Sequence, residues 1–98
     1  MQINQEKTDD KGRFYIEENN VVVAEMYYHF HNEKTFIITH TEVNELMEGK
    51  GIGKQLLVAA VEYARTNNFK IQATCPFAKK ILDRSNEFAD VYVTHKNI

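Results

Sequence analysis

The hydrophobic pattern of this chain changes its period at Gly51. Before that residue, apolar side chains alternate with polar ones in segments rich in β-branched and aromatic residues, which is the pattern of strands. Directly after it, apolar residues recur at the spacing of one helical face: Ile52, Leu56, Ala59, Ala60, Tyr63 and Ala64. Hairpin-linked strands followed by a helical crossover need a sheet with both antiparallel and parallel pairs. The pattern therefore predicts an α+β fold with a mixed sheet.

Three strands are expected before the helix, at residues 15–18, 21–30 and 35–43. Asn19 and Asn20 separate the first two, and asparagine tolerates the positive φ angles of a tight hairpin turn. A short polar stretch separates the second strand from the third. Since such short connections join antiparallel neighbours, these strands are expected to form an N-terminal antiparallel meander.

The second half of the chain contains two expected helices with a strand between them. The first helix ends near Asn68, because asparagine can take the left-handed conformation that closes a helix. Residues 70–75 alternate as a strand, and Pro76 then suits the first turn of a second helix that ends near Arg84. Residues 91–93 are expected to form a short closing strand, which gives the order βββαβαβ with two main helices.

The length of 98 residues is that of one domain, so a single domain over residues 1–98 is expected, with an ordered core at about residues 13–94. The 12 basic and 14 acidic residues give a net charge of −2, which offers no broad attraction to nucleic acid or to an anionic membrane. The first residues lack a signal-peptide pattern, and the longest apolar run, residues 56–61, is too short to span a bilayer. Cys75 is the only cysteine, which favours a reducing compartment. We therefore expect a cytoplasmic protein that binds neither nucleic acid nor membrane, as a monomer or a weak homodimer.

Three glycines, Gly49, Gly51 and Gly53, surround the start of the first helix and leave backbone N–H groups uncovered there. Such donors at the positive end of a helix dipole form a site for an anion such as phosphate. The spacing excludes a nucleoside-triphosphatase loop, because Glu48 and Gln55 stand where that loop needs glycine and a hydroxyl residue. It also excludes the dinucleotide fingerprint, whose third glycine comes one residue later and which needs a larger parallel sheet.

The segment Glu48-Gly49-Lys50-Gly51-Ile52-Gly53-Lys54 resembles the pyrophosphate loop of the GNAT superfamily of acyl-coenzyme A N-acyltransferases. That loop reads Gln or Arg, two residues, Gly, one residue, then Gly or Ala. Residues 43–46 resemble the strand end that hydrogen-bonds pantetheine, and the likeness extends over residues 36–88 in order and spacing. The resemblance is to the short, single-domain members, which keep the coenzyme-binding half and carry a cysteine near the acetyl site, here Cys75. It implies a minimal GNAT-like fold, acetyl-coenzyme A (acetyl-CoA) as co-substrate, no metal, and a small amine or a protein amine as an acceptor that the sequence does not identify.

The resemblance also implies a set of coenzyme-binding residues on the strand end, the loop and the second helix: Val43, Glu48, Gly49, Lys50, Gly51, Ile52, Gly53, Lys54, Phe77 and Lys80. Lys50 and Lys54 either add charge to the phosphate site or are solvated lysines of the helix start. Lys80 either approaches the 3′-phosphate or adenine end of the coenzyme or is simply solvated. Glu48 replaces the family's Gln or Arg and places an anion beside the proposed anion site, so only its backbone is expected to contribute.

Two side chains are candidates for catalysis. Cys75 lies where a strand ends and Pro76 begins a helix, so nearby helix amides would favour its thiolate. It would act as a nucleophile through an acetyl-cysteine or relay a proton to the departing thiol, or else it is a small buried residue that only packs. His40, three residues before Val43, is the candidate base, against the alternative of an ordinary surface or core histidine. The family's tyrosine acid is absent, because Leu82 occupies its position.

Three functions are consistent with these residues. The leading prediction is an N-acetyltransferase that moves an acetyl group from acetyl-CoA to an amine. The alternative is a non-catalytic acyl-CoA binding or sensor module, because the tyrosine acid and the usual acceptor-binding segment are absent. A third is a small interaction protein whose glycine loop is only a turn. No metal site is predicted, since His29 and His31 have no third ligand at a plausible spacing.

Overall fold

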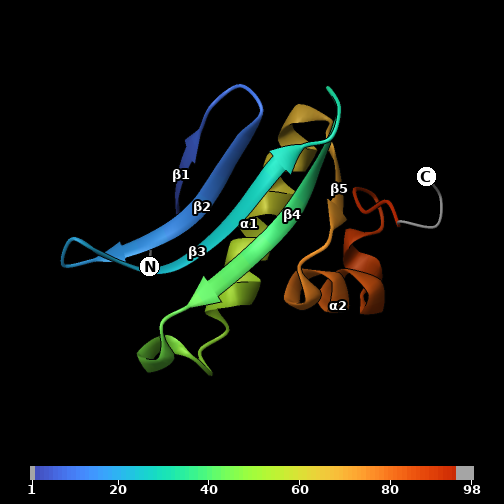
Figure 1. The fold of residues 1–98 in the computed structure, drawn as a ribbon. Helices are drawn as coiled ribbons and strands as arrows, with labels where there is room; N and C mark the ends of the chain where they lie inside the picture. The colour runs from blue at the N-terminus through green and yellow to red at the C-terminus, as the bar shows by residue number, and fades with distance from the viewer. Residues whose placement is uncertain (1, 95–98) are drawn as a thin grey trace.

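The computed structural model describes residues 2–94 of the chain. They form one mixed sheet in the order β1-β2-β3-β4-β5, with two α-helices and two short 3₁₀ turns (Figure 1). The elements in chain order are β1 (Asn4–Lys7), β2 (Lys11–Glu18), β3 (Val21–Phe30), β4 (Thr35–Val43), η1 (Glu45–Met47), α1 (Ile52–Asn67), β5 (Lys70–Ala73), α2 (Pro76–Arg84) and η2 (Asn86–Phe88).

The predicted α+β class, mixed sheet, antiparallel meander and two helices are confirmed. Strands β1 to β4 pair antiparallel with their neighbours, and β4 pairs with β5 in parallel. Asn19 and Asn20 turn the β2–β3 hairpin with φ angles of 51° and 65°. Asn68 closes α1 with a φ of 60°, and its N–H reaches the carbonyls of the last helical turn. The asparagines therefore act at the positions that the sequence predicts.

Two details of the element order differ from the prediction. The sequence does not predict strand β1, because Asn4–Lys7 is short and polar and shows no apolar alternation. It pairs along β2, which itself begins at Lys11, so the sheet starts before residue 13. The expected closing strand at residues 91–93 is reduced to an isolated bridge between Tyr92 and Ile71. The order within the described residues is therefore ββββαβα.

The core lies between α1 and one face of strands β2 to β4, and α1 runs behind the sheet in the view of Figure 1. One face of β3 contributes to this core, since Ala24, Met26 and Tyr28 are buried. Helix α2 lies beside β5, at the edge of the sheet away from β1 (Figure 1). None of the helices in residues 2–94 is long and apolar enough to cross a bilayer.

Strand β4 continues beyond the end of β5, and this difference in length shapes the candidate site (Figure 1). The parallel register ends at the pair Ile38 and Ala73. The N–H groups of Thr74 and Cys75 both donate to the Ile38 carbonyl, at 3.0 and 3.2 Å, and the chain then turns into α2. The second half of β4 therefore extends past β5, toward the start of α1.

Candidate functional site

The loop before α1 owes its shape to two glycines in the left-handed region. Gly49 has a φ of 81° and Gly51 a φ of 72°, and neither position has an atom within 4 Å of where a Cβ would lie. Gly51 is the N-cap of the 16-residue α1 and has no side chain to cap the helix. The first amides of α1 are therefore free of a side-chain cap at the positive end of the helix dipole, which is an arrangement that binds anions.

Gly53 is required for a different reason, which is the close approach of α2. A Cβ at Gly53 would lie 2.6 Å from Cζ of Phe77, so the Phe77 ring packs directly on the first turn of α1. The ring is only partly covered, with 40% of Phe77 exposed. This contact joins the start of α2 to the glycine loop.

A cavity of about 370 Å³ lies between the free end of β4, the glycine loop and α2. Its lining residues are Thr41, Val43, Met47, Glu48, Gly49, Gly51, Ile52, Gly53, Lys54, Phe77 and Ile81. The structure thus brings together the residues expected to bind the coenzyme, except Lys50 and Lys80. Lys50 does not line this cavity, and Lys80 lines a neighbouring one. We refer to this space as the loop cavity.

The charged side chains of the loop cavity are open to solvent. The Lys54 ammonium lies 3.8 Å from the Glu87 carboxylate, and both side chains are more than half exposed. The pair therefore neutralises the lysine only weakly. Glu48 is exposed as well. The backbone amides, which are fixed in place by the fold, remain the best-defined anion-binding groups of the loop.

Cys75 is buried, with 4% exposed, and its thiol donates a hydrogen bond of 3.3 Å to the hydroxyl of Thr41. The sulfur does not cap the α2 amides, although Cys75 is the N-cap residue. The expected contact with those amides is thus replaced by a contact with a β4 side chain that lines the loop cavity. An S–H group that donates to a hydroxyl at the cavity wall is suited to passing on a proton.

Sequence reasoning missed Thr41 because its position depends on an irregularity in β4. Tyr27 pairs with His40 and Tyr28 pairs with Ile38, so one extra residue, Thr39, is accommodated in β4. Beyond this bulge, Thr41 lies opposite the buried Met26 and on the same face of the sheet. Nothing in the residue pattern of the strand signals the bulge.

His40 lies on the opposite face of β4 from Thr41, because neighbouring strand residues alternate. Its side chain is 57% exposed, and its Nε2 lies 3.2 Å from a Glu42 carboxylate oxygen. Its ring centroid lies 6.1 Å from that of Tyr27. The structure therefore does not bring His40 and Cys75 into one cluster but places them on either side of the same strand.

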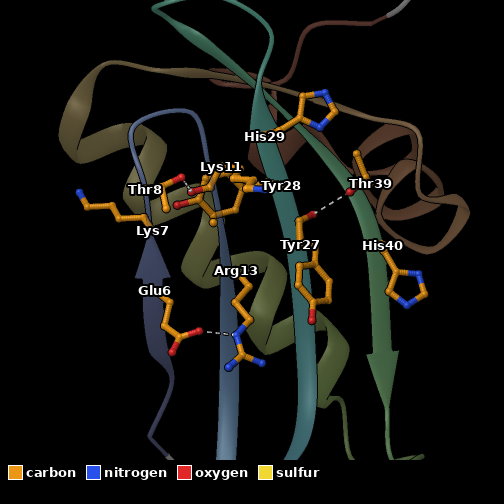
Figure 2. Close-up of a pocket in the computed structure, with 11 residues that line it drawn as sticks. Glu6, Lys7, Thr8, Lys11, Arg13, Tyr27, Tyr28, His29, Thr39 and His40 are labelled. Carbon is orange, nitrogen blue, oxygen red and sulfur yellow. Dashed lines mark hydrogen bonds and ion pairs between the residues drawn. The ribbon is translucent and has the colours of Figure 1, made fainter.

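The face of the sheet that carries His40 is hollowed into a cavity of about 840 Å³, the outer cavity (Figure 2). Arg13 crosses its floor and donates to Glu6 at 2.7 Å and to Glu25 at 2.8 Å. These carboxylates, Glu6 foremost, raise the pKa of Arg13 above its ordinary value. Tyr27 also donates to Glu25, and this bond raises the pKa of Tyr27. The outer cavity is the larger of the two, but it contains no helix start, so the loop cavity is the better site for a pyrophosphate.

Strand β4 separates the two cavities. Thr41 and Val43 line the loop cavity, whereas Thr39 and His40 line the outer cavity. The two cavities therefore lie on opposite faces of the same strand. Within residues 2–94, no group of three or more histidine, cysteine, aspartate or glutamate side chains is arranged to hold a metal ion.

Comparison with known proteins gives a consistent assignment. A family model described as GCN5-related N-acetyl-transferase matches residues 13–91. The chain is 40% identical to a GCN5-like protein from Staphylococcus aureus, whose solution structure aligns with a TM-score of 0.77 over 95% of this chain and 88% of that one. Protein NATD1 of Xenopus tropicalis is 33% identical over 57 residues, which are 58% of this chain and 52% of that protein. The match thus spans about half the length of the Xenopus relative.

A more distant structure shows the same fold. The ribosomal-protein-alanine N-acetyltransferase of Brucella melitensis biovar Abortus 2308 aligns with a TM-score of 0.65, over 80% of this chain and 64% of that one. Its sequence is 16% identical, so this likeness concerns the fold alone.

Proposed function

Because the chain belongs to the GCN5-related N-acetyl-transferase family, we propose that it transfers an acetyl group from acetyl-CoA to the nitrogen of an amine. The observation that carries this proposal is the loop cavity, in which an uncapped helix start meets the free end of β4. These are the two surfaces that a pyrophosphate and an extended pantetheine chain need. The acceptor is an amine, either small or on a protein.

Different residues of the loop cavity bind different parts of acetyl-CoA. Backbone amides of residues 49–54 bind the pyrophosphate, and Glu48 contributes its backbone while its carboxylate faces solvent. Val43, at the end of β4, offers its main chain to the pantetheine amides. Phe77 closes the cavity from the side of α2. When bound, acetyl-CoA supplies an acetyl group activated as a thioester.

His40 and Cys75 move protons from opposite faces of β4 in this proposal. His40 accepts the proton that the amine loses as its C–N bond forms, and Glu42 stabilises the resulting imidazolium. Cys75 donates the proton that the sulfur gains as its C–S bond breaks, directly or through the Thr41 hydroxyl. Exchange with water restores both side chains. The outer cavity gives the amine its route to His40.

A second candidate function is a binding module for acyl-CoA without catalysis. The observation that favours it is Leu82, which stands in place of the family's tyrosine acid and is 2% exposed. A buried leucine cannot donate a proton. The two functions share the loop cavity and differ in whether Cys75 replaces the tyrosine.

A turnover assay separates these functions. We would measure release of the CoA thiol from acetyl-CoA with a panel of amines, for the wild type and for the variants Cys75→Ala and His40→Ala. The acetyltransferase proposal predicts that each variant keeps its affinity for acetyl-CoA and loses about 100-fold or more in kcat, the usual contribution of a general acid or base. His31→Ala, at an exposed site in the β3–β4 turn, is the matched control and should keep full activity.

The outcomes discriminate clearly. If the wild type binds acetyl-CoA but releases no CoA thiol with any amine, only the binding-module function remains. Absence of binding would reject both functions. Full activity of Cys75→Ala would remove the thiol from the mechanism, and an acetyl mass on Cys75 during turnover would assign it the role of nucleophile instead.

A further inference from the structure

A cavity of about 620 Å³ lies at the end of the sheet away from the glycine loop. The β1–β2 turn, the β3–β4 turn and the C-terminal part of α1 meet at this end and bound the cavity (Figure 1). Tyr63, which lines it, lies about three turns beyond Ile52 in α1, or about 16 Å along the helix. The cavity is therefore separate from the loop cavity, and we refer to it as the aromatic cavity.

Three half-buried aromatic rings form the apolar wall of this cavity: Phe30, Tyr63 and Phe69. The Phe69 ring packs edge to face, with its centroid 5.0 Å from that of Phe30 and 5.6 Å from that of Tyr63. The face of an aromatic ring is electron-rich and attracts a cation that lies within about 6 Å of the centroid. The wall is thus both apolar and attractive to positive charge.

One cation of the protein already lies on this wall. The Lys7 ammonium is 5.3 Å from the centroid of the Tyr63 ring, and it makes no ion pair with any residue from 2 to 94. Lys7 is itself a lining residue, so the cavity of about 620 Å³ is the space that remains with its side chain in place. Pockets for small ligands range from about 300 to 1,000 Å³. The aromatic cavity therefore accommodates one ammonium group and has room for another.

The carboxylates at the rim of the cavity outnumber this cation. Asp9, Asp10 and Glu33 line the cavity and are exposed, and none of them forms an ion pair within the described part of the chain. The two turns that carry them are joined, because the Phe30 N–H donates to the Asp10 carbonyl at 2.6 Å. Three carboxylates against the single ammonium of Lys7 leave the cavity with an excess of negative charge. The site therefore attracts a further cation over its whole rim.

We propose that the aromatic cavity binds a methylated ammonium ion, with its methyl groups on the rings of Phe30, Tyr63 and Phe69. The carboxylates at the rim offset its charge. A methylated ammonium spreads its charge over groups that can contact several ring faces at once, and such cations are the ligands that aromatic cages recognise. The site lies at the other end of α1 from the glycine loop, so this inference goes beyond the proposed function and does not depend on it.

An NMR titration of the whole labelled protein with choline, at low ionic strength, tests the proposal. The comparison compound is 3,3-dimethylbutan-1-ol, which has the shape of choline without its charge. Choline should shift the ring signals of Tyr63 and Phe69 and bind about five-fold more tightly than the alcohol, the order of one partly exposed cation–π contact. Because the same cation occurs free and on protein side chains, a short peptide that contains trimethyllysine is titrated in parallel. The tighter of the two identifies the source of the ligand.

Three variants test the parts of the site. Glu33→Gln should weaken choline binding by about two-fold and leave the alcohol unaffected, since it removes one exposed charge. Lys7→Gln, which removes the competing ammonium, should strengthen choline binding. Tyr63→Leu keeps an apolar side chain but removes the ring, so it should abolish the preference for choline. The matched control is Glu18→Gln, at an exposed glutamate at the far end of the β2–β3 hairpin, which should change nothing.

Other outcomes would overturn the inference. Equal binding of choline and the alcohol by the wild type would mean that the cavity is only an apolar surface. Choline shifts confined to other parts of the protein would place the site elsewhere. An equal effect of Glu18→Gln and Glu33→Gln would mean that choline responds only to the overall charge. Thermal melting confirms that each variant is folded, and none of these results bears on the binding of acetyl-CoA.

Discussion

The contact between Gly53 and Phe77 predicts a substitution whose effect on stability depends on the partner residue. In Gly53→Ala, the new Cβ would lie 2.6 Å from one ring carbon of Phe77 and 2.9 Å from another, so the ring must turn outward. Full burial of a phenylalanine side chain is worth about 1.5–3 kcal/mol. Since 40% of Phe77 is already exposed, displacing the ring costs about 1–2 kcal/mol.

Helix propensity acts in the opposite direction. Alanine stabilises a helix by up to about 1 kcal/mol relative to glycine, and Gly53 lies in the first turn of α1. Gly53→Ala in the wild type should therefore be neutral to about 2 kcal/mol destabilising. In the Phe77→Ala background no ring has to move, so the same substitution should stabilise the protein by up to about 1 kcal/mol.

Urea unfolding of the wild type, both single variants and the double variant measures this coupling. We expect an interaction free energy of about 1–2 kcal/mol between positions 53 and 77, from the ring displacement alone. Equal stabilisation by Gly53→Ala in both backgrounds, with a coupling below about 0.5 kcal/mol, would refute the packing of α2 on the start of α1.

Three further substitutions test separate parts of the structure. Gly51→Ala forces a side chain into the left-handed conformation at about 1–2 kcal/mol, which lowers the melting temperature by roughly 4–8 °C for each kcal/mol in a domain of this size. Arg65 hydrogen-bonds Asp90 and lowers its pKa below the ordinary 3.8, so the stability that Asp90→Asn removes should be present above that pH and disappear as the pH falls through the folded pKa. Burial, and then a hydrogen bond to Asp83, raise the pKa of Tyr92 from 10 to about 12, so the advantage of the wild type over Tyr92→Phe should be full below pH 10 and shrink toward pH 12.

Denaturant unfolding at a series of pH values checks the predictions for Asp90→Asn and Tyr92→Phe. Thermal melting checks the prediction for Gly51→Ala. An unchanged melting temperature for Gly51→Ala would mean that the loop does not need its left-handed cap. A pH-independent difference between the wild type and either of the other variants would mean that the Asp90 or Tyr92 interaction is absent in solution.

Local sequence patterns predict the N-terminal half of the fold, except for the edge strand β1. The asparagine turn and the apolar face of β3 were predictable because each depends on residues close together in the chain. Strand β1 was not, because Asn4–Lys7 has no apolar pattern and is held by pairing to β2. Residues 91–93 show the converse: they have the pattern of a strand, but Tyr92 forms only a bridge, because a strand also needs pairing along a neighbour.

The candidate site was predictable in its glycine loop but not in its side-chain partners. A helix start without a side-chain cap is a local property, so Gly49 and Gly51 could be interpreted from spacing alone. That His40 and Cys75 lie on opposite sides of β4, and that Thr41 meets the thiol, depends on a bulge that the residue pattern does not show.

The most direct test of the central claim is a titration of the isotopically labelled protein with acetyl-CoA, followed at each backbone amide by NMR. Adenosine 3′,5′-bisphosphate, which lacks the pantetheine and thioester, serves as the control. Binding in the loop cavity predicts that the largest shifts occur at residues 43–54 and 75–80, and that the control leaves Val43, beside the expected pantetheine, unchanged. If saturating acetyl-CoA leaves the amides of residues 49–54 unchanged, the glycine loop is only a turn and the proposed coenzyme site is wrong.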